Sequence, residues 1–225
     1  MNSVVCLPLS PTPEQHQRLL ALQREFARVC NALAPVVQET RTWNRVALHH
    51  LMYRRLRELF PQVGSQIVCN AIYAVSKSSR LVFQSPGSPF HHSRLIGKPL
   101  PRLSFSEACP VYLDRHTLSI KEGRASMYTL DGRMRFQLAL SPQVEIAFHE
   151  RRLHEVALQR RDDSFELFFS FGDESPVEDA MASVQAAPGG RVSRKRTAVV
   201  GIPGMAAAGV SAPALPAYLR VDITA

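Results

Sequence analysis

The sequence lacks the features that define several large classes of protein. No stretch approaches the roughly 18 uncharged apolar residues that a membrane-spanning helix needs. No basic segment precedes an apolar block at the N-terminus, so we expect no secretory signal. With 45% hydrophobic and 20% charged residues among 225, the composition predicts a soluble globular protein with a real hydrophobic core.

Cysteine is also sparse, and its spacing excludes the common metal centres. The four cysteines are scattered, with no C-x-x-C pair and no Cys/His cluster, and the eight histidines have no consistent ligand spacing. The sequence therefore predicts neither a metal nor another cofactor. Scattered thiols of this kind favour a reducing compartment, with the cysteines acting as small buried hydrophobes.

Lysine is scarce as well, whereas arginine is abundant. The net charge is +8 and the isoelectric point is near 9.8. Arginine is the planar, bidentate donor that suits phosphate, so this balance favours a polyanionic partner, most often a nucleic acid.

The N-terminal half has strong helix signals. After an apolar strand, "SVVCLPL", Thr12 and Gln15 form a T-x-x-Q capping box with Pro13 at the first helical position. An apolar seam follows, and we expect Pro35 to end or kink this helix. The seam residues are Leu19, Leu22, Phe26, Val29, Leu33 and Val36.

Two further helices are predicted, over residues 41–59 and 65–83. The apolar side of the first consists of Val46, Leu48, Leu51, Met52, Leu56 and Leu59. In the second, the face opposite the core is predicted to carry Gln66, Asn70, Lys77 and Arg80.

The composition and the apolar pattern of the sequence change after residue 83. A Pro-, Gly- and Ser-rich loop over 84–105 leads into short runs with strand alternation, and Asp131-Gly132 is a strong hairpin turn. Six or seven short strands at this spacing suggest a small β-barrel. The strand-like runs are "RLSFS", "VYLDRHTLSIKEG", "RASMYTL", "RMRFQLAL", "VEIAF", "LHEVALQRR" and "SFELFFSF". Beyond Phe171 we expect a flexible linker, a basic cluster "RVSRKR" and no clear element in "SAPALPAYLRVDITA".

This order of elements resembles the N-terminal half of TnpB, the RNA-guided nuclease carried by insertion sequences, and of its type V CRISPR relatives. The motifs that carry the resemblance are P-T-x-E-Q before the first helix and S-Q-x-x-x-x-A-I at the start of the third. The resemblance implies an α+β fold, in which a small wedge-type β-barrel contains an inserted helical recognition domain. Residues 1–10 would be the first barrel strand, 11–90 the helical domain, 91–171 the rest of the barrel, and 172–225 a linker with a truncated or degenerate RuvC-like start.

In the segment that matches the family's catalytic part, this chain departs from the family's pattern. The family's RuvC-like strand ends Gly-Ile-Asp, and its aspartate is one of three carboxylates that hold two Mg²⁺ ions. Here Gly201 and Ile202 are followed by Pro203, and Asp222 is the only later carboxylate. We therefore expect no catalytic residue and no DNA cleavage. A flexible C-terminal tail would stand in place of the RuvC-like domain.

The resemblance also implies nucleic-acid contacts. Gln66 and Asn70, at i and i+4 on one helical face, are the candidates for reading DNA bases, with two solvated amides as the alternative. The candidates for the nucleic-acid backbone are Arg41, Arg45, Arg54, Arg57, Lys77 and Arg80, together with Arg191, Arg194, Lys195 and Arg196 of the basic cluster. Solvated helix faces and a solvated linker are the alternatives for these cations.

Three interpretations remain open. The first is a nuclease-inactive, TnpB-like protein that binds guide-type RNA; double-stranded target DNA and a separate nuclease subunit are further partners, and no membrane is involved. Such a protein would be prokaryotic and cytoplasmic, and nucleoid-associated when bound to DNA. The second is a truncated or frameshifted transposon relic. The third is a generic RNA-binding module of a ribonucleoprotein.

Overall fold

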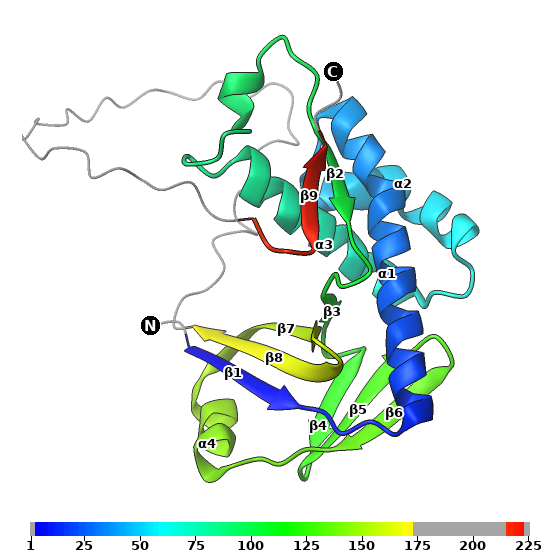
Figure 1. The fold of residues 1–225 in the computed structure, drawn as a ribbon, viewed down its shortest axis with the longest axis vertical. Coiled ribbons are helices and arrows are strands. Elements are labelled where there is room, and N and C mark those ends of the chain that lie inside the picture. The colour runs from blue at the N-terminus through cyan, green and yellow to red at the C-terminus, as the bar shows by residue number, and fades with distance from the viewer. Residues whose placement is uncertain (1–2, 173–214, 223–225) are drawn as a thin grey trace, which may run out of the picture.

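The computed structural model describes residues 3–172 and 215–222. The described chain is an α+β protein, as predicted. Its helices and strands are drawn in Figure 1. The helices are α1 (Pro13–Thr40), α2 (Arg45–Leu59), α3 (Ser65–Phe83) and α4 (Pro142–Glu150), and a short 3₁₀ helix, η1, spans His92–Leu95.

The strands form three antiparallel sheets. In the four-stranded sheet the order is β1-β8-β7-β3, in the three-stranded sheet β4-β5-β6, and in the two-stranded sheet β2-β9. In chain order the strands are β1 (Ser3–Pro8), β2 (Arg102–Phe105), β3 (Val111–Leu113), β4 (Leu118–Lys121), β5 (Arg124–Thr129), β6 (Gly132–Gln137), β7 (Arg152–Arg161), β8 (Ser164–Gly172) and β9 (Leu219–Asp222).

The strands of the described chain do not close into a barrel. β3 ends at Leu113, and Asp114 then accepts hydrogen bonds from the backbone N–H groups of His116 and Thr117, both at 3.0 Å. This Asx-type turn redirects the chain. As a result, β4 leaves the sheet that contains β3 and pairs only with β5.

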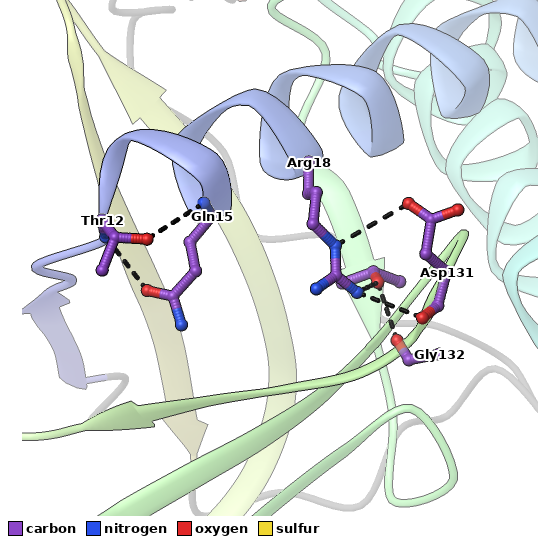
Figure 2. Close-up of polar contacts among 6 residues, drawn as sticks. Thr12, Gln15, Arg18, Asp131 and Gly132 are labelled. Carbon is purple, nitrogen blue, oxygen red and sulfur yellow. Dashed lines mark hydrogen bonds and ion pairs between the residues drawn. The ribbon is translucent and has the colours of Figure 1, made fainter.

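Helix α1 begins with the predicted capping box (Figure 2). The Gln15 N–H donates to Thr12 Oγ1 at 3.3 Å, and the Thr12 N–H donates to Gln15 Oε1 at 3.0 Å. Of the two outcomes expected at Pro35, an end or a kink, the first is wrong: α1 continues to Thr40. Proline removes only one helical hydrogen bond, and buried residues on both sides of it, Ala34 and Val37, keep this part of the helix packed.

Helix α1 runs from the β4–β6 sheet to the β2–β9 sheet and packs on α3 (Figure 1). All but the last residue of its predicted seam are fully buried, and the core that they join extends into the β-sheets without interruption. At its first turns Arg18 donates to Thr129 Oγ1 and to the Asp131 carbonyl, both at 3.1 Å (Figure 2). The start of α1 is therefore fastened to the β5–β6 hairpin.

Helix α2 is shorter than predicted. It begins at Arg45 rather than Arg41, because Asn44 caps it: its side-chain oxygen accepts from the N–H groups of Val46 at 2.9 Å and Ala47 at 3.1 Å.

The apolar side of α2 is also narrower than predicted. Leu48, Met52 and Leu56 are buried, but Val46, Leu51 and Leu59 are 50–55% exposed. A helix that packs along a single i, i+4, i+8 row buries only that row, so the apolar residues beside it stay in water.

The predicted strand "VEIAF" is wrong: these residues lie in helix α4. Ser141 caps this helix by accepting from the Val144 N–H at 3.4 Å, and Pro142 follows at the first helical position. In the helix, the partly buried Val144 and Phe148 are four residues apart, whereas Ile146 is 51% exposed. Over five residues, apolar alternation does not distinguish a strand from a helix, and the capping residues decide.

The expectation of no element near the C-terminus is also wrong. Residues Leu219–Asp222 form β9, which pairs antiparallel with β2. Leu219 is 4% exposed and joins the core. A four-residue strand has too weak a local pattern to be predicted, and its partner lies more than a hundred residues earlier in the chain.

Candidate nucleic-acid interface

The predicted backbone cations of the helices do not form one patch, because several are held by other parts of the protein. Arg41 donates to the carbonyl groups of Leu95 at 2.7 Å and Lys98 at 3.0 Å, and so secures the loop after η1. Arg57 donates to the Val63 carbonyl and holds the connection between α2 and α3.

The other predicted cations have different surroundings. The Arg45 guanidinium lies 5.3 Å from the centre of the Tyr73 ring. Lys77 forms an ion pair with Glu155, and Arg80 also interacts within the protein. Arg54 is exposed on α2. The four basic residues of the cluster at 191–196 lie outside the described residues.

The predicted pair of base readers does share one face of α3, but that face is turned toward β3. Asn70 is 5% exposed, and its amide donates to the Tyr112 carbonyl at 3.0 Å. The expectation that Asn70 faces solvent is therefore wrong. Helix α3 packs against both α1 and β3, so part of its polar side is covered as well. Spacing places two side chains on one face but does not say whether that face is exposed.

Gln66 is less enclosed. Its amide donates to the Asp114 carboxylate, and it lies 3.5 Å from Asn70 Oδ1. A base could reach this pair only by opening the hydrogen bonds that now hold it. Base reading by Gln66 and Asn70 stays a prediction.

Sequence reasoning missed a second group of cations, on the outward face of the β4–β6 sheet. Side chains alternate across a strand, so the outward positions are occupied by every second residue. Four of these exposed side chains are basic, and we call them the basic sheet face: Lys121, Arg124, Arg133 and Arg135. Most of the inward positions are apolar and buried, among them Ala125, Met127, Met134 and Phe136.

The register of the strands brings these cations close together. Lys121 lies opposite Arg124, and Arg133 and Arg135 are successive outward residues of β6. Like charges directly opposite each other destabilise a sheet. No carboxylate occupies an outward position of these three strands; the nearest ones are at the turns, Glu122 beside Lys121 at 3.5 Å and Asp131. A bound polyanion would relieve this repulsion.

One end of the basic sheet face adjoins the start of α3. The Arg133 guanidinium lies 5.8 Å from the centre of the Tyr128 ring and donates to the His116 carbonyl at 3.0 Å. On its helical side, Tyr128 lies against Gly64, where an added Cβ would be 3.5 Å from a ring carbon. This end of the face therefore lies beside Gly64, the residue that precedes α3.

A sequence signal for the basic sheet face was present. In "RMRFQ", after the Asp131-Gly132 turn, basic and apolar residues alternate, and in "RASMYT", before it, Arg124 and Ser126 alternate with Ala125 and Met127. This pattern predicts a hairpin with one apolar face and one polar face that is rich in arginine.

In the part of the chain that the structure describes, no group of three or more His, Cys, Asp or Glu side chains is placed to hold a metal ion. Within the same residues, no helix has the length and apolar character needed to cross a membrane. The four cysteines are free thiols.

Comparison with models of known families and with curated proteins finds no match to this chain. Its functional interpretation therefore depends on the residues themselves.

Proposed function

We propose that this protein is a TnpB-like, nuclease-inactive protein that binds a guide-type RNA. The observation that carries the proposal is the basic sheet face. Its four cations are exposed, adjacent and unopposed by outward carboxylates. Arginines in this arrangement contact phosphates and position a nucleic acid without selecting its sequence, which is the role of the protein in RNA-guided recognition.

The proposal includes the domain arrangement of that family. β1, at residues 3–8, pairs with β8 near residue 170, while α1, α2 and α3 lie between them in sequence. This is the connectivity expected of a helical recognition unit (residues 11–90) inserted after the first strand of a wedge domain (residues 1–10 and 91–171). Target DNA and a separate nuclease subunit are proposed as further partners, in a prokaryotic cytoplasm.

The absence of nuclease activity is proposed from one residue. Pro203 stands where the family's motif has its first metal-binding aspartate, and proline has no side chain that can hold Mg²⁺. We expect the purified protein to leave linear and supercoiled DNA intact with Mg²⁺ or Mn²⁺. Metal-dependent cutting that persists in a Pro203→Ala variant and through further purification would contradict this part of the proposal.

RNA that copurifies with the protein tests the main claim. The tagged protein is isolated from its host at moderate salt, and the bound RNA is extracted and sequenced. We expect one short RNA encoded beside the gene itself. Bulk transfer RNA would instead favour a generic RNA-binding module, and the absence of RNA would refute RNA binding.

The neighbouring DNA separates a functional protein from a transposon relic. Translation of the other reading frames past codon 203 would restore the missing carboxylates if the ending arose by a frameshift. We expect no such frame. A restored motif would favour the relic.

A further inference from the structure

A cavity of about 630 Å³ lies where the sheets fail to close into a barrel. We call it the β4–β7 cavity. Its walls come from α3, β3, β4, α4, β7 and β8 and from the turn between β3 and β4, and most of the wall residues are apolar or aromatic. The apolar side chains that line it are Leu113, Leu118, Ile120, Phe148, Leu153, Val156 and Phe169. This volume is within the range of pockets for small organic ligands, about 300–1,000 Å³.

Two carboxylates and one amide line the same cavity, namely Asp114, Glu155 and Gln66. Both carboxylates are already oriented by the protein. Glu155, whose side chain is 14% exposed, accepts from the Tyr73 hydroxyl at 2.8 Å and from Lys77. Asp114 accepts from the Thr117 hydroxyl at 2.9 Å and from Gln66. Acceptors held in this way need little reorganisation when they bind a donor.

The cavity adjoins the basic sheet face. Arg115 and His116, in the turn between β3 and β4, are exposed residues that line it. Arg133 of the basic sheet face donates to the His116 carbonyl. A nucleic-acid strand whose phosphates lie on the basic sheet face can therefore reach the cavity through this turn.

We infer that the β4–β7 cavity binds one unstacked base of the RNA strand held by the basic sheet face, and that it selects bases with an exocyclic amino group. Single-stranded RNA is read in this way, with the base against apolar or aromatic side chains and its edge hydrogen-bonded. Carboxylates accept from an amino group such as that of cytosine. Adenine, cytosine and guanine carry one, and uracil does not. The inference rests on the proposed RNA binding.

Fluorescently labelled oligo(A), oligo(C) and oligo(U) of equal length test the inference by direct titration of the full chain. Uracil presents only its ring N–H as a donor, whereas adenine and cytosine present an amino group to the carboxylates, so we expect oligo(U) to bind about tenfold more weakly than oligo(A) and oligo(C).

The test variant is Leu153→Trp. Leu153 is 44% exposed at the cavity and can take a larger side chain without repacking the core. We expect this variant to bind all three oligonucleotides with the affinity that the unchanged protein has for oligo(U). The control is Leu51→Trp, which adds the same ring at a 55% exposed leucine of α2 that does not line the cavity, and it should keep the preference. Thermal unfolding of both variants checks that they are folded.

The outcomes separate the two proposals. Equal affinity of the unchanged protein for all three oligonucleotides, or a preference that survives in folded Leu153→Trp, would overturn the cavity inference while leaving RNA binding intact. Should Leu153→Trp not fold, the preference is tested with Gln66→Ala, which we expect to weaken it. Failure of the unchanged protein to bind any of the three would refute the proposed function, and the cavity inference with it.

Discussion

Lys77 Nζ lies 2.5 Å from Glu155 Oε2 and joins the middle of α3 to β7. From its spacing in the sequence, Lys77 is predicted to lie on an exposed face of α3 and to contact phosphate. In the structure its charge instead neutralises a mostly buried carboxylate, and it lies 5.2 Å from the centre of the Tyr112 ring. Its role in the fold and its predicted role in binding can be separated by experiment.

Lys77→Ala should lower the free energy of unfolding by about 1–2 kcal/mol, because it leaves Glu155 buried without its cation. RNA affinity should change little. Lys121→Ala is the matched control: this lysine is exposed on the basic sheet face, so its loss should cost under about 0.5 kcal/mol of stability and weaken RNA binding. Urea denaturation and oligonucleotide titration measure the two effects, and the reverse pattern would contradict our assignment.

Removal of charge from the basic sheet face should reduce the salt dependence of RNA binding. Each phosphate contact with a single strand contributes about 0.7 to the slope of log affinity against log salt concentration. The double variant Arg124→Gln/Arg135→Gln should therefore reduce the slope by roughly 1.4. Arg102→Gln, an exposed strand arginine of the β2–β9 sheet, should leave it unchanged. Equal slopes for all three proteins would mean that RNA binds elsewhere.

Asn70→Ala should destabilise the protein by about 1–3 kcal/mol, because the buried Tyr112 carbonyl loses its hydrogen bond from the Asn70 amide. Gln137→Ala removes an exposed amide from β6 and should stay within about 0.5 kcal/mol of the unchanged protein. Chemical denaturation gives both values. An Asn70→Ala variant of undiminished stability would show that the amide contributes little to the fold and would leave it available for base reading.

The capping box of α1 should make a measurable contribution to the free energy of unfolding. Thr12→Ala removes the acceptor for the Gln15 N–H and should cost about 1 kcal/mol. Thr12→Ser keeps the hydroxyl and should be nearly neutral. The two variants differ by a few atoms at one position, so a common denaturation midpoint would show that the cap does not stabilise the folded chain.

Stability should fall at alkaline pH because of Tyr112 and Tyr218. Burial raises the pKa of both hydroxyls, and in Tyr112 the raised pKa lies well above the ordinary value of about 10. The folded state therefore holds these protons more tightly than the unfolded state. The resulting stability is complete below pH about 10 and is lost as the pH rises from there through the folded pKa values.

Tyrosinate absorbance during an alkaline titration measures this effect. Of the five tyrosines, Tyr112 and Tyr218 should ionise only as the protein unfolds. Tyr112→Phe, which keeps the ring contact with Tyr73 at 5.3 Å, should make the loss of stability with pH less steep. Ionisation of all five tyrosines in a protein that is still folded would contradict the prediction.

The elements with complete local signals could be predicted from the sequence. Thr12 and Gln15 define the start of α1, Ser65–Phe83 has a regular apolar period, and Asp131-Gly132 marks the β5–β6 hairpin. Local hydrogen bonds and backbone preferences form these features, and neighbouring residues are sufficient to specify them.

Features that depend on a distant partner could not be predicted in the same way. β9 forms because β2 provides an edge with which it can pair. Leu51 and Leu59 stay exposed because α2 buries only the row that contains Leu48, Met52 and Leu56. Prediction of the candidate site also required knowledge of contacts between residues distant in sequence. The cations of the basic sheet face belong to strands whose outward side is known only once the inward side has been buried.

By itself, the sequence determined the α+β class, most of the helix and strand positions and the excess of positive charge, since composition, caps and periodicity are properties of the chain alone. Only the tertiary structure decided which polar side chains face water. It turned Asn70 and Lys77 toward β-strands and left the arginines of β5 and β6 exposed. When one face of a helix or strand is buried, its opposite face is left in water. The elements that pack against the helix or strand determine which face is buried.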